Sequence, residues 1–164
     1  MQTKVTFAPH ADAGRIAREI DADVVIVVTS ENDKAPELEL GRARRVDVKF
    51  DDVDEDDADC GRPISESDAR RCADAIRGAR RCVVTCRGGV SRSAAIAAAA
   101  EVAGVADVIR ARAFGENAVG HFSCPNRLVF ETVARELGLD VEARREETDA
   151  LFERNVREHL AANL

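Results

Sequence analysis

The segment over residues 81–103 constrains the fold of this chain more than any other. It begins with an apolar run at residues 82–85, which is typical of a buried β-strand. It ends with an alanine-rich stretch, Ser93 to Ala103, that is apolar around nearly the whole circumference of a helix. A helix that is apolar on every side is buried on every side. We therefore expect this helix at the centre of the molecule, directly after a buried strand.

The rest of the chain alternates between strand and helix patterns, which is typical of an α/β fold. The patterns predict strands over residues 5–8, 23–29, 46–50 and 81–86. They predict helices over residues 12–20, 65–78, 93–103, 105–114, 126–137 and 142–162. A chain of 164 residues has room for one sizeable core, so we expect a single domain over residues 1–164 that ends in the 142–162 helix.

The order of elements from Val46 to Cys86 predicts how the strands are arranged. This stretch reads strand, loop, helix, strand, a unit that normally forms two neighbouring parallel strands. We therefore expect a mostly parallel central sheet flanked by helices. Because parallel strands end at the same edge of a sheet, the loop after Phe50 and the loop after Cys86 are expected to meet there.

The loop from Cys86 to Ser93 carries the residues that point to chemistry. Backbone N–H groups between a strand and a helix N-terminus form a site for anions, and Arg92 can donate two parallel hydrogen bonds to a phosphate. The same positive field stabilises the thiolate of Cys86, which makes it a nucleophile. We expect the phosphate to be held by the loop residues Arg87, Gly88, Gly89, Val90 and Ser91.

Attack of a thiolate on a phosphate ester also needs an acid that protonates the leaving oxygen. The acidic run at residues 51–59 follows a predicted strand whose end should lie beside Cys86. We favour Asp52 as this acid, with Asp54 second and Asp51 third. The same aspartate then activates the water that releases phosphate, and Ser93 hydrogen-bonds the Cys86 sulfur as it departs. This scheme needs no metal and no organic cofactor.

The spacing of Cys86, Arg92 and Ser93 resembles the nucleophile loop of the cysteine-dependent protein tyrosine phosphatase superfamily, nearest its dual-specificity and bacterial predicted tyrosine phosphatase branches. The residues at 50–53 are similar to that family's strand end with its acid, and those at 124–126 to its later helix start. The resemblance covers about residues 4–140. It implies a dual-specificity phosphatase-like fold, a phosphocysteine intermediate and a phosphorylated protein or peptide as substrate. Thr85 departs from the pattern, because such phosphatases usually carry a histidine there.

Other functions remain open at this point. Rhodanese-like phosphatases and arsenate reductases share the Cys-to-Arg spacing. A protein that binds phosphate without hydrolysing an ester would have the same loop at residues 86–93. The phosphate ester could also belong to a molecule other than a protein. Four arginines could steer a second phosphate or an acidic peptide, namely Arg42, Arg44, Arg45 and Arg87. The short chain leaves little room for a lid, which favours a shallow pocket that accepts phosphoserine and phosphothreonine beside phosphotyrosine.

Charge and cysteine content narrow the partners and the compartment. A net charge of −7 argues against nucleic-acid and membrane-surface binding, and no apolar stretch approaches the roughly 20 residues that span a bilayer. Five cysteines without the density of a disulfide scaffold favour the cytoplasm. His121 and Cys124 form half of a metal-like pair, but no second pair lies at a matching spacing. We expect a monomer without a bound metal, and Cys82 and Cys124 as core thiols rather than disulfide partners of Cys86.

Overall fold

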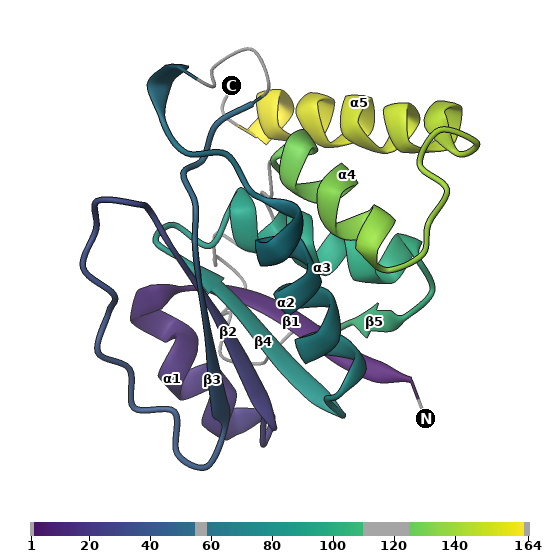
Figure 1. Cartoon of the computed structure of the whole chain (residues 1–164). Helices are drawn as coiled ribbons and strands as arrows, with labels where there is room; N and C mark the ends of the chain where they lie inside the picture. Colours follow the sequence, from purple (N-terminus) through teal and green to yellow (C-terminus); the bar gives the residue numbers. More distant parts are fainter. Residues whose placement is uncertain (1, 55–58, 110–124, 163–164) are drawn as a thin grey trace.

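The chain folds into an α/β structure built on one parallel sheet (Figure 1). The computed structural model describes residues 2–54, 59–109 and 125–162. The strands within these ranges are β1 (Thr3–Pro9), β2 (Val24–Thr29), β3 (Arg44–Lys49), β4 (Arg81–Cys86) and β5 (Ala106–Val108). The helices are α1 (His10–Glu19), α2 (Glu66–Arg77), α3 (Arg92–Val102), α4 (Arg127–Glu136) and α5 (Arg145–Ala162).

The five strands lie in the order β3-β2-β4-β1-β5, and every neighbouring pair is parallel. The connection from β1 to β2 crosses the sheet toward the β3 edge. The connections from β3 to β4 and from β4 to β5 cross it toward the β5 edge. Right-handed crossovers in opposite directions place their helices on opposite faces of a sheet. Accordingly, α1 packs on one face, while α2 and α3 cover the other, with α4 packed behind them (Figure 1).

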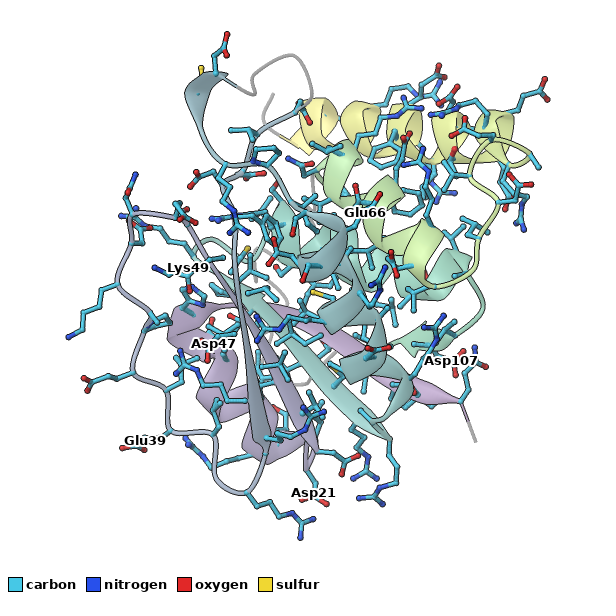
Figure 2. The ribbon with its side chains drawn as sticks, viewed as in Figure 1. Asp21, Glu39, Asp47, Lys49, Glu66 and Asp107 are labelled. Carbon is cyan, nitrogen blue, oxygen red and sulfur yellow. The ribbon has the colours of Figure 1, made fainter. Side chains whose placement is uncertain are left out.

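The expected parallel sheet is confirmed, but the expected pairing of the strands that flank α2 is wrong. β3 and β4 do not pair, because β2 lies between them and hydrogen-bonds to both. Every residue of β2 is buried, and such a strand belongs in the interior of a sheet. β3 instead alternates buried apolar residues with exposed charged ones such as Asp47 and Lys49, which suits an edge (Figure 2).

The prediction of a helix over residues 105–114 is also wrong for residues 105–109, which are the part of this range that the structure describes. Gly104 has a φ of 70°, which ends α3 and turns the chain back toward the sheet. Residues Ala106–Val108 then form β5 beside β1, and the backbone N–H of Ile109 donates to the carbonyl of Val5 at 2.8 Å. A short segment that contains Asp107 therefore pairs with β1 as an edge strand. Residues 110–124 lie outside the described ranges.

The remaining elements match the patterns that predicted them. β4 spans Arg81–Cys86 as expected, and α3 is buried along nearly all of its length. Ser65 and Asp68 form a capping box at the start of α2, and Asn126 caps α4. The last helix begins at Arg145, and its Phe152 packs edge-to-face on Phe130 with ring centroids 5.2 Å apart. No helix in the described ranges is both long and apolar enough to cross a membrane.

Candidate active site

Cys86 lies at the carboxyl end of β4, where the central strands of the sheet end. Its side chain is 3% exposed, and its Sγ lies 3.1 Å from the hydroxyl oxygen of Ser93 on the first turn of α3. The fold therefore fixes the thiol beside a hydroxyl group that can donate to it. Cys86 and Ser93, which the loop pattern selected together, are in contact.

The loop after Cys86 is held in shape by Gly89, which lies against the end of β1. Gly89 has a φ of 65°, a conformation that L-residues with side chains rarely adopt. A Cβ atom on Gly89 would lie 2.2 Å from the backbone nitrogen of Pro9. Glycine is thus the residue that allows the loop to fold back onto the sheet. Gly88 before it is exposed, and a Cβ atom added there would have nothing within 4 Å.

The backbone N–H groups of this loop have no backbone partners within the described ranges. No carbonyl of the described residues accepts a hydrogen bond from the amides of residues 88–91. Ser91 stands at the N-cap of α3, but its side chain makes no capping hydrogen bond there. An anion in the loop would meet these amides and the positive end of the helix dipole together. The loop is therefore built to accept a group such as phosphate.

Arg92 supplies a buried positive charge at the end of the loop. Its side chain is 6% exposed, and its Nη1 donates to the hydroxyl of Ser30 at 3.0 Å and to the carbonyl of Phe50 at 2.9 Å. In the described part of the chain, its buried Nε has no hydrogen-bond partner and no carboxylate forms an ion pair with it. A buried guanidinium in this state is unfavourable unless an anion joins it. Nη1 of Arg92 is thus held in place, while its buried Nε–H still lacks a partner among the described residues.

Asp52 contacts the loop directly, as the shared sheet edge predicts. Its Oδ1 accepts hydrogen bonds from the Ser91 hydroxyl at 2.8 Å and from the Asn126 side-chain amide at 2.9 Å. Asn126 also donates to the carbonyl of Val53 at 3.2 Å, while its own Oδ1 caps α4 by accepting from Val129 at 3.0 Å. The sequence identified Asn126 only as a helix cap, and its second role depends on packing between α4 and the loop after β3.

The other two candidate acids lie in different surroundings. The Asp51 carboxylate accepts hydrogen bonds from the backbone N–H of Arg62 at 2.7 Å and of Glu31 at 3.1 Å. These bonds, chiefly the one from Arg62, lower the pKa of Asp51, so it stays ionised and ties two loops together. Asp54 is exposed, as Asp52 is, but of the two only Asp52 has a hydrogen bond to the loop among the described residues; residues 55–58 of the acidic run lie outside the described ranges. The geometry therefore favours Asp52 as the carboxyl that serves the loop.

Replacing Asp51 by asparagine tests this structural role. We expect Asp51→Asn to lower the free energy of unfolding by about 1–2 kcal/mol at pH 7, because the amide replaces one acceptor with a donor that faces a backbone N–H. Since the pKa of Asp51 is lower in the folded state, its contribution is full above the unfolded value of about 3.9 and is lost as the pH falls further. Urea unfolding at pH 7 and pH 3 measures both effects. Asp54→Asn is the control, and an equal loss in both variants at pH 7 contradicts the assignment.

A histidine reaches the residue before the nucleophile from another part of the chain. The Nδ1 of His10, the first residue of α1, lies 3.1 Å from the hydroxyl oxygen of Thr85. Thr85 is fully buried. Burial lowers the pKa of His10, and the charge of Arg92 lowers it further, so its imidazole is neutral at pH 7. No pattern in the sequence indicates this contact, because the two residues belong to the ends of different strands.

Two other thiols are core residues, and two of the arginines that could steer a second anion form ion pairs. Cys72 and Cys82 are fully buried, and burial raises the pKa of Cys82 to about 12. Arg42 pairs with Asp21, which Figure 2 shows at the bottom of the view, and Arg45 pairs with Asp47. Arg87 lies at the loop itself and is exposed. His121 and Cys124 lie outside the described ranges, within which no group of three potential metal ligands occurs.

Comparisons of the chain with models of protein families, with curated proteins and with solved structures found no match. The function of the site has to be inferred from its geometry. That geometry combines a thiol beside a hydroxyl, loop amides without a backbone partner in the described ranges, a buried guanidinium and a carboxylate hydrogen-bonded to the same loop. Such a set of groups can bind a phosphate, attack it and protonate a leaving oxygen.

Proposed function

We propose that this protein is a phosphoric monoester hydrolase of the cysteine-dependent kind, which works through a phosphocysteine intermediate. The observation that carries the proposal is the buried Arg92, whose Nε has no partner among the described residues, at the end of a loop that begins with Cys86. A dianionic phosphoryl group would satisfy both the guanidinium and the loop amides that have no backbone partner among the described residues. Its phosphorus would then lie in the same loop as the thiol.

In the first step the thiolate of Cys86 attacks phosphorus, an S–P bond forms, and the bond between phosphorus and the ester oxygen breaks. The proton of the Asp52 carboxyl passes to that oxygen, so the product leaves as an alcohol. The loop amides and Arg92 stabilise the charge that builds up on the three remaining oxygens. Because both hydrogen bonds to Asp52 from described residues end on Oδ1, the proton is expected on Oδ2.

In the second step water attacks the phosphocysteine, and the ionised Asp52 takes a proton from that water. The S–P bond breaks, inorganic phosphate forms, and the sulfur of Cys86 leaves as a thiolate. The Ser93 hydroxyl, 3.1 Å from that sulfur, stabilises the thiolate by donating a hydrogen bond. Asn126 acts as a positioning residue, because its amide holds Asp52 against the loop in both steps.

Two aryl phosphates with different leaving groups test the role of Asp52. We expect Asp52→Asn to lower kcat/KM, which reports phosphoryl transfer to Cys86, about 10²–10⁴-fold for phenyl phosphate and much less for 4-nitrophenyl phosphate, because nitrophenolate leaves without a proton. Steady-state kinetics of both esters, with Asp54→Asn as the matched control, give the comparison.

The same assay decides among the alternatives. Equal losses for the two esters, or a larger loss in Asp54→Asn, would contradict Asp52 as the acid. If the wild type hydrolysed neither ester, the protein would instead bind phosphate without turnover. Cys86, preceded by Thr85, would then not act as a nucleophile.

The remaining expectations belong to the same proposal. We place the protein in the cytoplasm, since all four cysteines in the described ranges carry free thiols and a thiol nucleophile needs a reducing compartment. Its partner is a phosphorylated substrate rather than a nucleic acid, in keeping with the net charge of −7. We propose that it acts as a monomer.

A further inference from the structure

We infer that the substrate is a small phosphate ester that carries a second anionic group, and that this group binds in a cavity beside the Cys86 loop. The inference rests on the proposed function, which assigns the phosphate to that loop. It narrows the substrate to a class of small molecules with two anionic ends, as opposed to a phosphorylated side chain of a protein.

The cavity lies beside the Cys86 loop, which forms one of its walls. It has a volume of about 280 Å³, and Arg87 and Arg92 of the loop line it. The opposite wall comes from the end of β2 and the segment after it, including Ser30, which already binds Arg92. Neither Cys86 nor Asp52 lines the cavity. It is therefore suited to the part of a substrate that does not react.

A buried hydroxyl that lacks a partner marks this cavity as a binding site. Thr29, the last residue of β2, is 4% exposed and lines the cavity, yet its Oγ1 has no hydrogen-bond partner among the described residues. A buried hydroxyl without a partner is unfavourable. Only two such side-chain atoms occur in the described residues, Thr29 Oγ1 and Arg92 Nε, and both residues line this cavity. The reacting phosphate accounts for Arg92 Nε, so Thr29 Oγ1 is the donor left for an oxygen acceptor on the other end of the ligand.

The charges around the cavity favour an anion. Lys34, Arg87 and Arg92 line it, and none of them pairs with a carboxylate of the described residues. Arg45 lies close by, since its Nη1 donates to the carbonyl of the lining residue Pro36 at 2.8 Å, but it is paired with Asp47. Asp33 is the acidic residue in the lining, and His10 is neutral. With Arg92 assigned to the reacting phosphate, the two positive charges of Lys34 and Arg87 and the one negative charge of Asp33 leave a net charge of +1. A positive cavity on a chain with a net charge of −7 is a local arrangement that concentrates anions.

The size and lining of the cavity favour a small polar molecule. Its volume lies at the lower end of the range of ligand pockets. Among the described residues no Phe, Tyr or Trp side chain lines it, and the imidazole of His10 is the one ring in the lining. Hydroxyl, ammonium and guanidinium donors dominate instead. A short diol or sugar with a phosphate at each end matches this set of donors.

Matched pairs of ligands test the inference by binding, without depending on turnover. Alkanediol bisphosphates of increasing chain length and alkyl monophosphates of the same lengths are titrated into the Cys86→Ser protein by calorimetry. We expect the best bisphosphate to bind at least about tenfold more tightly than its monophosphate, because it gains a second charge-assisted contact. Equal affinities at every chain length would overturn the inference, as would tighter binding of a phosphotyrosine peptide than of any bisphosphate.

Variants of the cavity show where the second group binds. The bisphosphate preference is the ratio of the Kd of a monophosphate to the Kd of its matched bisphosphate. Lys34→Gln and Thr29→Val, each added to Cys86→Ser, should lower this ratio about tenfold or abolish the preference. Lys4→Gln removes the same charge from a residue paired with Asp107 on β5, away from the loop (Figure 2), and should leave the preference unchanged. Thr29→Val should keep or raise the melting temperature, because it removes a buried hydroxyl that has no partner among the described residues.

The outcomes separate the two proposals. Hydrolysis of 4-nitrophenyl phosphate by the wild type without any bisphosphate preference would overturn the second anion site alone. A bisphosphate preference without hydrolysis would overturn the proposed enzyme and keep the site. An unchanged preference in both cavity variants would place the second group elsewhere and would also overturn the inference.

Discussion

Replacing Cys86 by serine is expected to lower kcat for 4-nitrophenyl phosphate by at least about 10⁴-fold while phosphate binding survives. A serine hydroxyl stays protonated near neutral pH and is a poor nucleophile, and no base contacts this position among the described residues. The groups proposed to hold phosphate are untouched, because Arg92 keeps its bonds to Ser30 and Phe50 and the substitution changes no loop amide. Steady-state kinetics and calorimetry with inorganic phosphate measure the two effects separately.

A second cysteine provides the control for this experiment. Cys60 is exposed, and Cys60→Ser should leave kcat within about twofold of the wild type. Retention of more than a tenth of the wild-type kcat in Cys86→Ser would contradict the role of the thiol. A folded Cys86→Ser protein that no longer binds phosphate would contradict the assignment of binding to the loop amides and Arg92.

Replacing Gly89 by alanine is expected to lower the free energy of unfolding by at least about 3 kcal/mol. Two costs add at this position. The φ of 65° is unfavourable for alanine, and the new Cβ would lie 2.2 Å from the backbone nitrogen of Pro9. Pro9 is the last residue of β1 and pairs with Cys86, so relief of the clash requires the strand end or the loop to move. Urea unfolding measures the loss.

Gly88 is a matched control within the same loop. It is exposed, and a Cβ placed on it would contact nothing within 4 Å. Gly88→Ala should therefore change the free energy of unfolding by no more than about 0.5 kcal/mol. Equal losses in the two variants would mean that Gly89 does not lie against the end of β1.

Local signals account for the parts of the structure that the sequence predicted. The apolar run before Cys86 forms β4 at the expected residues, and the alanine-rich stretch after Arg92 forms the buried helix α3. Ser65 and Asn126 cap helices as their side chains favour. The meeting of Asp52 with the Cys86 loop followed from one general rule, because parallel strands end at one edge of a sheet.

Non-local packing accounts for the parts that the sequence did not predict. Nothing in the composition of β3 and β4 indicates that β2 lies between them. That arrangement depends on β2, which is apolar on both faces and is therefore buried in the interior of the sheet. The contact between His10 and Thr85 likewise arises because β1 and β4 pair side by side. The cavity beside Arg92 depends on the path of the segment after β2, which no periodic pattern describes.

The most direct test of the account is to look for the covalent intermediate itself. Asp52→Asn protein, in which the hydrolysis of the intermediate should be slow, is mixed rapidly with 4-nitrophenyl phosphate, quenched in acid, digested and analysed by mass spectrometry. We expect a phosphoryl group on the peptide that contains Cys86, formed at the rate of the nitrophenolate burst. Release of nitrophenolate with Cys86 unmodified, or with the phosphoryl group on another residue, would contradict the central claim.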